Sequence, residues 1–225
     1  MLSKVKSRLR RILWPPLHKA TTRHPYVFLG TNYGGWPLLE TTPRGALLYS
    51  FGVGEDISFD LAAIKRFECQ VHAFDPTPKS MRWVAQQFVP PSFSFHAGGL
   101  AAADGEAAFA PPLSEGYVSF SSVAAVGQKV ENAITAPVRR LKTHMESLGT
   151  REPDIIKMDI EGFEYEVIED LMRTRILPRQ LLVEFHHNLY GFQNFDTMHA
   201  VDALMAAGYD LFYISSSGRE YGFCL

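Results

Sequence analysis

Cysteine is scarce in this sequence, which has only Cys69 and Cys224 among its 225 residues. Two cysteines cannot build a disulfide framework, so a reducing compartment is the default expectation. Long apolar runs are also missing: none approaches the roughly 18 residues of a membrane-spanning helix, and no signal-peptide core is visible. We therefore expect a cytoplasmic protein.

The sequence also lacks an excess of charge of either sign. Its formal net charge is −2, which argues against a general nucleic-acid-binding protein. Hydrophobic residues make up 46% of the chain and charged residues 20%, the proportions of a soluble globular protein. A chain of this length is long enough for one substantial domain, and we place that domain at residues 26–225.

Residues 1–25 differ from the rest in composition. Basic side chains alternate with apolar ones at helical spacing, and the pattern stops at Pro15 and Pro16. The basic residues are Lys4, Lys6, Arg8, Arg10 and Arg11. We interpret residues 1–25 as a basic amphipathic N-terminal extension. Two interpretations stay open: a solvated or frayed surface helix, or a peripheral contact of residues 1–14 with an anionic membrane or an acidic partner.

Two glycines and an aspartate mark a candidate nucleotide-binding unit. An apolar strand predicted at 46–51 enters a turn that contains Gly52 and Gly54. The next strand, predicted at 70–74, ends in Asp75 about 20 residues after that turn. Glycine lets the backbone approach a cofactor closely, and an acid at this place accepts hydrogen bonds from ribose hydroxyls. A tight turn and a helix N-cap are the structural alternatives, and a nicotinamide cofactor is the chemical one.

Acids and histidines follow two later apolar strands. The strand predicted at 154–159 ends in Asp159, and the strand predicted at 181–186 ends in Glu184 and His186. In open α/β sheets the carboxyl ends of the strands form the ligand-binding edge, so we expect these side chains to lie together. Because side chains alternate along a strand, Glu184 and His186 share a face.

Two kinds of chemistry suit this group. A histidine with a pKa near neutral can remove a proton from a hydroxyl, so Glu184 and His186 are the predicted catalytic pair, with Asp159 beside them. Carboxylates with one imidazole also suit Mg²⁺ or Mn²⁺, so the same three residues are candidate metal ligands. In the metal-free alternative, Glu161 and Glu164 favour the N-terminus of the next helix. A purely structural strand end is the third interpretation.

The remaining sequence alternates between helical and strand periodicity. Helices are predicted at 56–67, 79–88, 163–173 and 196–207, and residues 139–148 combine a strand end with a helix. A strand is predicted at 93–97, a hairpin turn at Asp104-Gly105, a loop or lid at 111–128, and a terminal antiparallel hairpin at 209–215 and 220–224. This order predicts an α/β protein with a doubly wound, Rossmann-like, mostly parallel sheet that ends in a C-terminal antiparallel β-hairpin.

Together these motifs resemble a class I S-adenosylmethionine-dependent methyltransferase of the FkbM type. The resemblance is carried by Tyr49-Ser50-Phe51-Gly52-Val53-Gly54, Asp56-Ile57-Ser58-Phe59-Asp60, Phe74-Asp75-Pro76-Thr77, Lys157-Met158-Asp159-Ile160-Glu161-Gly162 and Val183-Glu184-Phe185-His186. It implies a seven-stranded sheet, S-adenosylmethionine at the carboxyl ends of the first strands, and usually O-methylation. The expected acceptor is a hydroxyl of a small molecule, a sugar or a glycan.

Two positions depart from the pattern of that family. Ser50 stands where an acid usually precedes the first glycine by two residues, and Asp56 stands at the third glycine position. Glu55 and Asp56 are therefore expected to contact the charged amino-acid end of the cofactor, and Gly98 is expected near its adenine. The alternative function is a non-catalytic Rossmann-like binding domain that docks through its basic N-terminus.

Aromatic residues fall in several loop-like segments. They are Tyr33, Trp36, Tyr117, Phe120 and Tyr190. We expect them either to line an acceptor pocket or to cover the hydrophobic core.

Overall fold

The computed structural model describes residues 17–110, 121–122 and 133–225. The expectations for residues 1–14, Tyr117 and Phe120 lie outside these ranges, as does most of the segment 111–128. Within the described ranges, no helix is long and apolar enough to cross a membrane.

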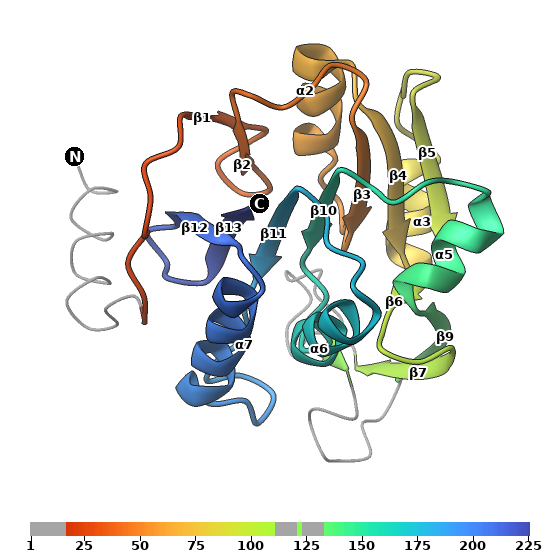
Figure 1. The fold of residues 1–225 in the computed structure, drawn as a ribbon. Coiled ribbons are helices and arrows are strands. Elements are labelled where there is room, and N and C mark those ends of the chain that lie inside the picture. The colour runs from red at the N-terminus through yellow and green to blue at the C-terminus, as the bar shows by residue number, and fades with distance from the viewer. Residues whose placement is uncertain (1–16, 111–120, 123–132) are drawn as a thin grey trace, which may run out of the picture.

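A mostly parallel central sheet positions the candidate site (Figure 1). In the described ranges its seven strands are β3 (Leu47–Phe51), β4 (Gln70–Asp75), β5 (Phe93–Ala97), β10 (Ile155–Met158), β11 (Gln180–Glu184), β12 (Asp210–Ile214) and β13 (Glu220–Cys224). Their spatial order is β12-β13-β11-β10-β3-β4-β5, and β13 runs antiparallel to both of its neighbours. The predicted α/β fold with a mostly parallel sheet is confirmed, and β12 and β13 form an antiparallel hairpin.

Helices cover both faces of this sheet. They are α2 (Ser58–Phe67), α3 (Pro78–Val84), α5 (Leu141–Leu148), α6 (Glu164–Thr174) and α7 (Asn194–Ala206). Figure 1 shows α5, α6 and α7 on one side of the sheet and α3 on the other. On β3, Tyr49 and Phe51 face the core of α5, α6 and α7, whereas Leu48 faces the core that includes α2. A strand buried on both faces must be apolar throughout, which explains the continuous apolar runs of the sequence.

Two smaller sheets flank the central one. β1 (Tyr26–Leu29) and β2 (Trp36–Leu39) form an antiparallel pair, and Trp36 and Leu38 pack into the core that includes α2. The other sheet has the order β6 (Gly99–Leu100), β9 (Ile134–Arg139), β7 (Gly105–Ala110) and β8 (Ser121–Ser122). Neither sheet was predicted from the sequence.

The hairpin predicted around Asp104-Gly105 is wrong. β7 pairs antiparallel with β9 and β8, and β6 pairs with β9 rather than with β7. Phe109 and Val138 explain this pairing, because both are 5% exposed and belong to one small hydrophobic core. The turn at 104–105 therefore leads into a strand whose partner comes much later in the chain.

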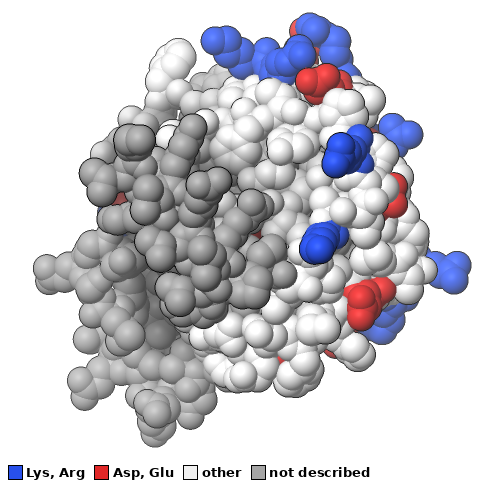
Figure 2. All heavy atoms as spheres, turned by 90° about the vertical axis from the view of Figure 1, so that its left-hand side faces the viewer, with Lys and Arg blue, Asp and Glu red and all other residues white. Residues whose placement is uncertain are grey.

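The segment before β1 runs along β12, at the edge of the central sheet. The Thr21 backbone N–H donates to the Leu211 carbonyl at 2.8 Å, and the Leu211 N–H donates to the Thr21 hydroxyl at 3.2 Å. On β1, the rings of Tyr26 and Tyr213 meet edge to face with centroids 5.4 Å apart. Figure 2 shows the face on this side of the molecule, where the described surface is largely uncharged, with isolated Lys or Arg side chains in the middle and more charged residues along the top and right.

Candidate active site

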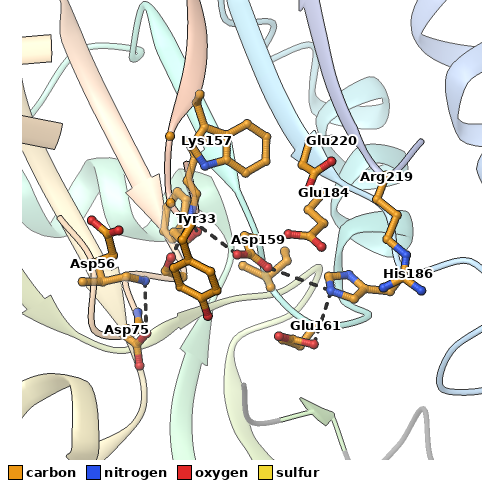
Figure 3. Close-up of a pocket in the computed structure, with 18 of the residues that line it drawn as sticks. Tyr33, Asp56, Asp75, Lys157, Asp159, Glu161, Glu184, His186, Arg219 and Glu220 are labelled. Atoms are coloured by element: carbon orange, nitrogen blue, oxygen red, sulfur yellow. Dashed lines mark hydrogen bonds and ion pairs between the residues drawn. The ribbon is translucent and has the colours of Figure 1, made fainter. Parts of the chain in front are cut away.

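A cavity of about 730 Å³ opens at the carboxyl ends of β3, β4, β10 and β11 (Figure 3). Its lining includes these residues predicted from the sequence: Gly52, Gly54, Glu55, Asp56, Asp75, Asp159, Glu184 and His186. Gly98 is not among the lining residues; it borders a separate cavity of about 360 Å³, and its neighbour Gly99 lines the larger one. The common strand edge therefore brings together residues that are far apart in the sequence.

The glycine turn after β3 forms one wall of the cavity. Gly52 has a φ of +84° and Gly54 a φ of +56°, a region that favours glycine. A Cβ atom on Gly52 would lie 1.8 Å from the carbonyl oxygen of Asp159, so no side chain fits there. A Cβ atom on Gly54 would meet nothing within 4 Å. The turn thus brings the backbone of β3 directly against the end of β10.

Asp75 holds this turn from the end of β4. Its Oδ2 accepts hydrogen bonds from the N–H groups of Val53 (3.1 Å) and Gly54 (2.9 Å). Its Oδ1 accepts from the N–H (2.9 Å) and hydroxyl (2.7 Å) of Thr77, and Thr77 itself caps α3. A carboxylate has about four acceptor positions, and the chain uses all of them. A ribose hydroxyl would therefore share Asp75 with these partners or replace one of them.

The two acids after the turn are also held by the chain. Glu55 forms an ion pair with Lys79 at 3.2 Å. Asp56 accepts the Thr31 hydroxyl at 2.6 Å and the Ser58 N–H at 2.7 Å. Partial burial raises the pKa of Asp56, but the hydrogen bonds from Ser58 and Thr31 outweigh burial and lower it. Asp56 at the third glycine position thus ties the β1–β2 loop to the start of α2.

Lys157 is a site residue that the sequence analysis did not single out. Its side chain is 8% exposed, and its Nζ donates to the carbonyl oxygens of Phe51 (3.2 Å) and Gly52. The same Nζ lies 5.5 Å from the centre of the Trp36 ring and 3.9 Å from Asp159 Oδ2. A lysine in the middle of an apolar strand was the signal that could have revealed it, because a buried cation needs partners.

Asp60 brings a buried carboxyl group close to Lys157. It is 3% exposed on α2, and its Oδ1 accepts no hydrogen bond from the described residues. Burial raises the pKa of Asp60 to about 6, although the charge of Lys157 and a hydrogen bond from Ser50 act in the opposite direction. Position 50 therefore holds a serine in place of the usual acid, and the Ser50 side chain is hydrogen-bonded to the carboxyl group of Asp60 on α2.

Asp159, Glu184 and His186 meet opposite the glycine turn, as predicted. One ligand atom from each lies within 4.8 Å of the other two. Figure 3 shows Asp159 between the Lys157 side of the cavity and His186. Glu184 is also the register partner of Glu220 on β13, and like charges placed directly opposite each other cost stability.

Glu164 fixes His186 at the base of this group. It is fully buried, and its Oε1 accepts hydrogen bonds from the backbone N–H (2.9 Å) and the Nδ1 (3.0 Å) of His186. Its Oε2 accepts the Gly162 N–H at 2.9 Å. Because the His186 N–H bonds to a side chain, β11 ends at Glu184 rather than at the predicted residue 186. The predicted strand alternation therefore does not set the direction of His186, and Glu164 does.

The other ring nitrogen of His186 also faces carboxylates. Its Nε2 lies 3.2 Å from Glu161 Oε2 and 3.9 Å from Asp159 Oδ1. Burial lowers the pKa of His186, but the hydrogen bonds to Glu161 and Glu164 outweigh burial and raise the pKa well above its ordinary value. With carboxylate oxygens at both ring nitrogens and a raised pKa, the doubly protonated form of the ring is favoured.

The two remaining carboxyl groups are shifted toward neutral pH. Burial raises the pKa of Asp159 to about 6, although the charge of Lys157 acts against it. Burial and the charge of Asp159 raise the pKa of Glu184 well above its ordinary value. Two neighbouring carboxyl groups with raised pKa values can share a proton, so one can donate a hydrogen bond while the other accepts one.

Aromatic and polar residues form the rim of the cavity. Tyr33 is 80% exposed at its mouth, and the Tyr190 hydroxyl donates to Glu161 Oε2 at 2.6 Å. Trp36 also lines the cavity but is 4% exposed and packs into the core. The facing rim was not predicted from the sequence. It consists of Phe28, Tyr213, Ser215, Ser216, Ser217, Arg219 and Glu220.

Comparison with known proteins identifies the family to which this chain belongs. The family model of the methyltransferase FkbM domain matches residues 50–211, which is most of the chain. The chain belongs to the FkbM methyltransferase family. This match confirms the resemblance to class I S-adenosylmethionine-dependent methyltransferases of the FkbM type.

Individual relatives of this FkbM-family chain are distant. The human probable methyltransferase-like protein 24 is 26% identical over 148 residues, which cover 65% of this chain and 34% of that protein. The rat protein of the same name matches to the same extent. The chain thus spans about a third of the length of these two proteins. The crystal structure of methyltransferase FkbM from Methylobacillus flagellatus KT has a TM-score of 0.51 at 13% identity, covering 80% of this chain and 44% of that chain, and shows a shared fold.

Proposed function

We propose that this FkbM-family chain transfers a methyl group from S-adenosylmethionine to a hydroxyl oxygen of a small molecule, a sugar or a glycan. The observation that carries the proposal is one cavity with two different walls. The glycine turn and Asp75 form one wall, and Asp159, Glu184 and His186 form the other. A donor on the first wall would present its methyl group to an acceptor on the second.

The glycine turn fits the donor. Gly52 and Gly54 leave the backbone open to close approach, and Asp75 is the strand-end acid expected to bind the ribose. When bound, S-adenosylmethionine supplies an electrophilic methyl group on a sulfonium sulfur. The residues of the chain then have two tasks, which are to hold the acceptor oxygen in line with that methyl group and to take the acceptor's proton.

Asp159 is the base that the geometry favours. His186 holds a proton on each nitrogen, so it cannot accept another, which moves this role away from the histidine favoured by the sequence. Asp159, with a pKa of about 6, is ionised at neutral pH and can accept the hydroxyl proton. Burial and the charge of Asp159 raise the pKa of Glu184 well above its ordinary value, and in its protonated form Glu184 can orient the acceptor oxygen by a hydrogen bond.

A divalent cation fits this cluster less well than a metal-free acid–base group. Asp159 and Glu184 offer the oxygen ligands that Mg²⁺ or Mn²⁺ prefers, and they repel each other without a cation. His186, however, would have to break its contact with Glu161 and lose a proton before Nε2 could coordinate an ion. We therefore expect methyl transfer to persist in EDTA.

The rim supports a hydroxylated acceptor. The exposed ring of Phe28 lies beside Tyr213, with centroids 6.4 Å apart, and both line the cavity. The hydroxyls of Ser215 and Ser217 donate to Glu220, so this side of the rim combines flat rings with hydrogen-bonding groups. Flat rings and carboxylates together suit a sugar, whose C–H face packs on a ring while its hydroxyls donate to oxygens.

Calorimetry and a labelled-methyl assay test the proposal. We expect the wild-type protein to bind S-adenosylhomocysteine and to transfer labelled methyl groups to at least one member of a panel of sugars and small alcohols. Asp159→Asn should bind S-adenosylhomocysteine like the wild type and transfer about 10²–10⁴-fold more slowly. Binding without transfer across the panel would favour the non-catalytic binding domain, and absence of binding would reject the cofactor assignment.

A further inference from the structure

Away from the cavity, three side chains that bind transition metals meet at the edge of the central sheet. Asp210 on β12 and Cys224 on β13 are register partners on antiparallel strands, so their side chains stand next to each other on one face. His24, from the segment before β1, places its Nε2 3.1 Å from Asp210 Oδ2. One ligand atom from each of the three residues lies within 4.8 Å of the other two.

We propose that His24, Asp210 and Cys224 bind a zinc ion that fastens the segment before β1 to the C-terminal hairpin. Thiolate, imidazole and carboxylate are the ligand types that zinc takes in proteins, at bond lengths of about 2.0–2.3 Å. A thiolate ligand makes Mg²⁺ and Ca²⁺ poor candidates, because these ions prefer oxygen. Three protein ligands leave the fourth tetrahedral position to water.

The backbone on both sides of His24 is already fixed. Thr21 forms hydrogen bonds with Leu211 on one side, and the ring of Tyr26 packs on Tyr213 on the other. Tetrahedral zinc places its ligand atoms about 3.3–3.8 Å apart, so small side-chain rotations close the site. The side chains of His24 and Asp210 are 41% and 49% exposed, which leaves them free to make this adjustment.

Cys224 is the proposed ligand whose surroundings a bound cation would change most. It is a free cysteine, 4% exposed, and its register partner Asp210 brings a carboxylate beside its thiol. Zinc binds the thiolate form of cysteine, so zinc binding would displace the thiol proton of Cys224. A zinc ion would thus offset the repulsion between Asp210 and the Cys224 thiolate.

Cobalt(II) titration of the untagged, metal-free 225-residue chain provides the test. Cobalt occupies zinc sites, and a thiolate ligand gives it a near-ultraviolet charge-transfer band that oxygen and nitrogen ligands do not. We expect the wild type to develop this band with one equivalent of cobalt, and zinc to abolish it. Zinc should also raise the melting temperature of the metal-free protein.

Cys224→Ala should abolish the band and the zinc-dependent rise in melting temperature, and His24→Ala should weaken binding about tenfold or more. Cys69→Ala is the matched control, because Cys69 is also a buried free cysteine that packs in the same core. It should keep the band. Circular dichroism would verify that each variant folds. A wild type without the band, or a band that survives in Cys224→Ala or disappears in Cys69→Ala, would overturn the proposal. Zinc bound equally well by Cys224→Ala would assign the ion to another site and also overturn it.

Discussion

Among single residues, Glu164 has the strongest expected effect on stability. It is fully buried and pairs with His186, whose pKa is raised in the folded protein. Glu164→Gln should lower the free energy of unfolding by about 3 kcal/mol, because the imidazolium keeps its buried charge but loses its partner. A raised folded-state pKa makes this contribution fully present below pH about 6.5 and removes it as the pH rises through the raised value. Urea unfolding at about pH 6 and about pH 9 would measure the loss at both ends of this window.

Glu169 provides a control on the same helix. Its side chain is exposed, so Glu169→Gln should change the free energy of unfolding by less than about 0.5 kcal/mol. If Glu164→Gln costs as little as Glu169→Gln at about pH 6, or costs the same amount at both pH values, the buried ion pair is not the source of stability.

A second residue-level prediction concerns Asp159 and the pH dependence of methyl transfer. Since burial raises the pKa of Asp159 to about 6, the rate at saturating cofactor should fall as the pH drops through this value and the carboxylate gains a proton. His186→Ala should also slow transfer, but a fall below pH about 6 should remain in it if Asp159 is the base. A pH profile that loses this fall in His186→Ala but keeps it in Asp159→Asn would return the role of base to the histidine.

The sequence could reveal residues that end strands, but not the residues that support them. Asp159, Glu184 and His186 follow apolar runs, and parallel strands bring such ends to one edge. Glu164 is different, since its helical position and acidic type are those of an ordinary exposed residue near a helix N-terminus. Its burial depends on the packing of α6 against the end of β11, which no local pattern encodes.

Among elements, the turn between β3 and α2 offers a sharp comparison. Gly52→Ala should lower the free energy of unfolding by about 2 kcal/mol or more and weaken binding of S-adenosylhomocysteine. The reason is that the new Cβ atom would lie 1.8 Å from the Asp159 carbonyl oxygen. Gly54→Ala should cost about 1–2 kcal/mol, since it meets no atom within 4 Å and carries only the penalty of its positive φ. Chemical denaturation and calorimetry of both variants would measure this difference, and equal effects would show that contact with β10 does not matter.

Strand positions could be predicted where a strand pairs with another strand that is close to it in the sequence. The strand predicted at 93–97 coincides with β5, and the hairpin predicted at 209–215 and 220–224 contains β12 and β13. The sheet of β6, β7, β8 and β9 was not predictable in the same way. Its pairing depends on the burial of residues such as Phe109 and Val138 in one small core, which joins segments with weak periodicity. The sequence therefore encodes the central sheet more plainly than the strands around it.

For the whole molecule, the fold predicts a measurable linkage between ligand and stability. S-adenosylhomocysteine at about 100 times its dissociation constant should add about 2.7 kcal/mol to the free energy of unfolding. For a chain of this size, that increment corresponds to a rise of about 5–10 °C in melting temperature. Differential scanning calorimetry with and without the ligand would measure the shift, and adenosine monophosphate would serve as the control. An equal shift with both compounds would indicate general nucleotide binding.

Two segments that line the cavity lie outside the family match. The match covers residues 50–211, whereas the cavity lining also includes Phe28 and Tyr33 before the match and Tyr213 and Arg219 after it. These segments touch each other through the rings of Phe28 and Tyr213. Under the proposed function, a related protein could therefore acquire a new acceptor by replacing the β1–β2 and β12–β13 hairpins. The glycine turn and Asp75, which are proposed to bind the methyl donor, would stay unchanged. Because the two rings lie beside each other, the hairpins should be exchanged as a pair. A chimera that carries both hairpins from a relative should take on that relative's acceptor, whereas one that carries a single hairpin should lose activity toward either acceptor.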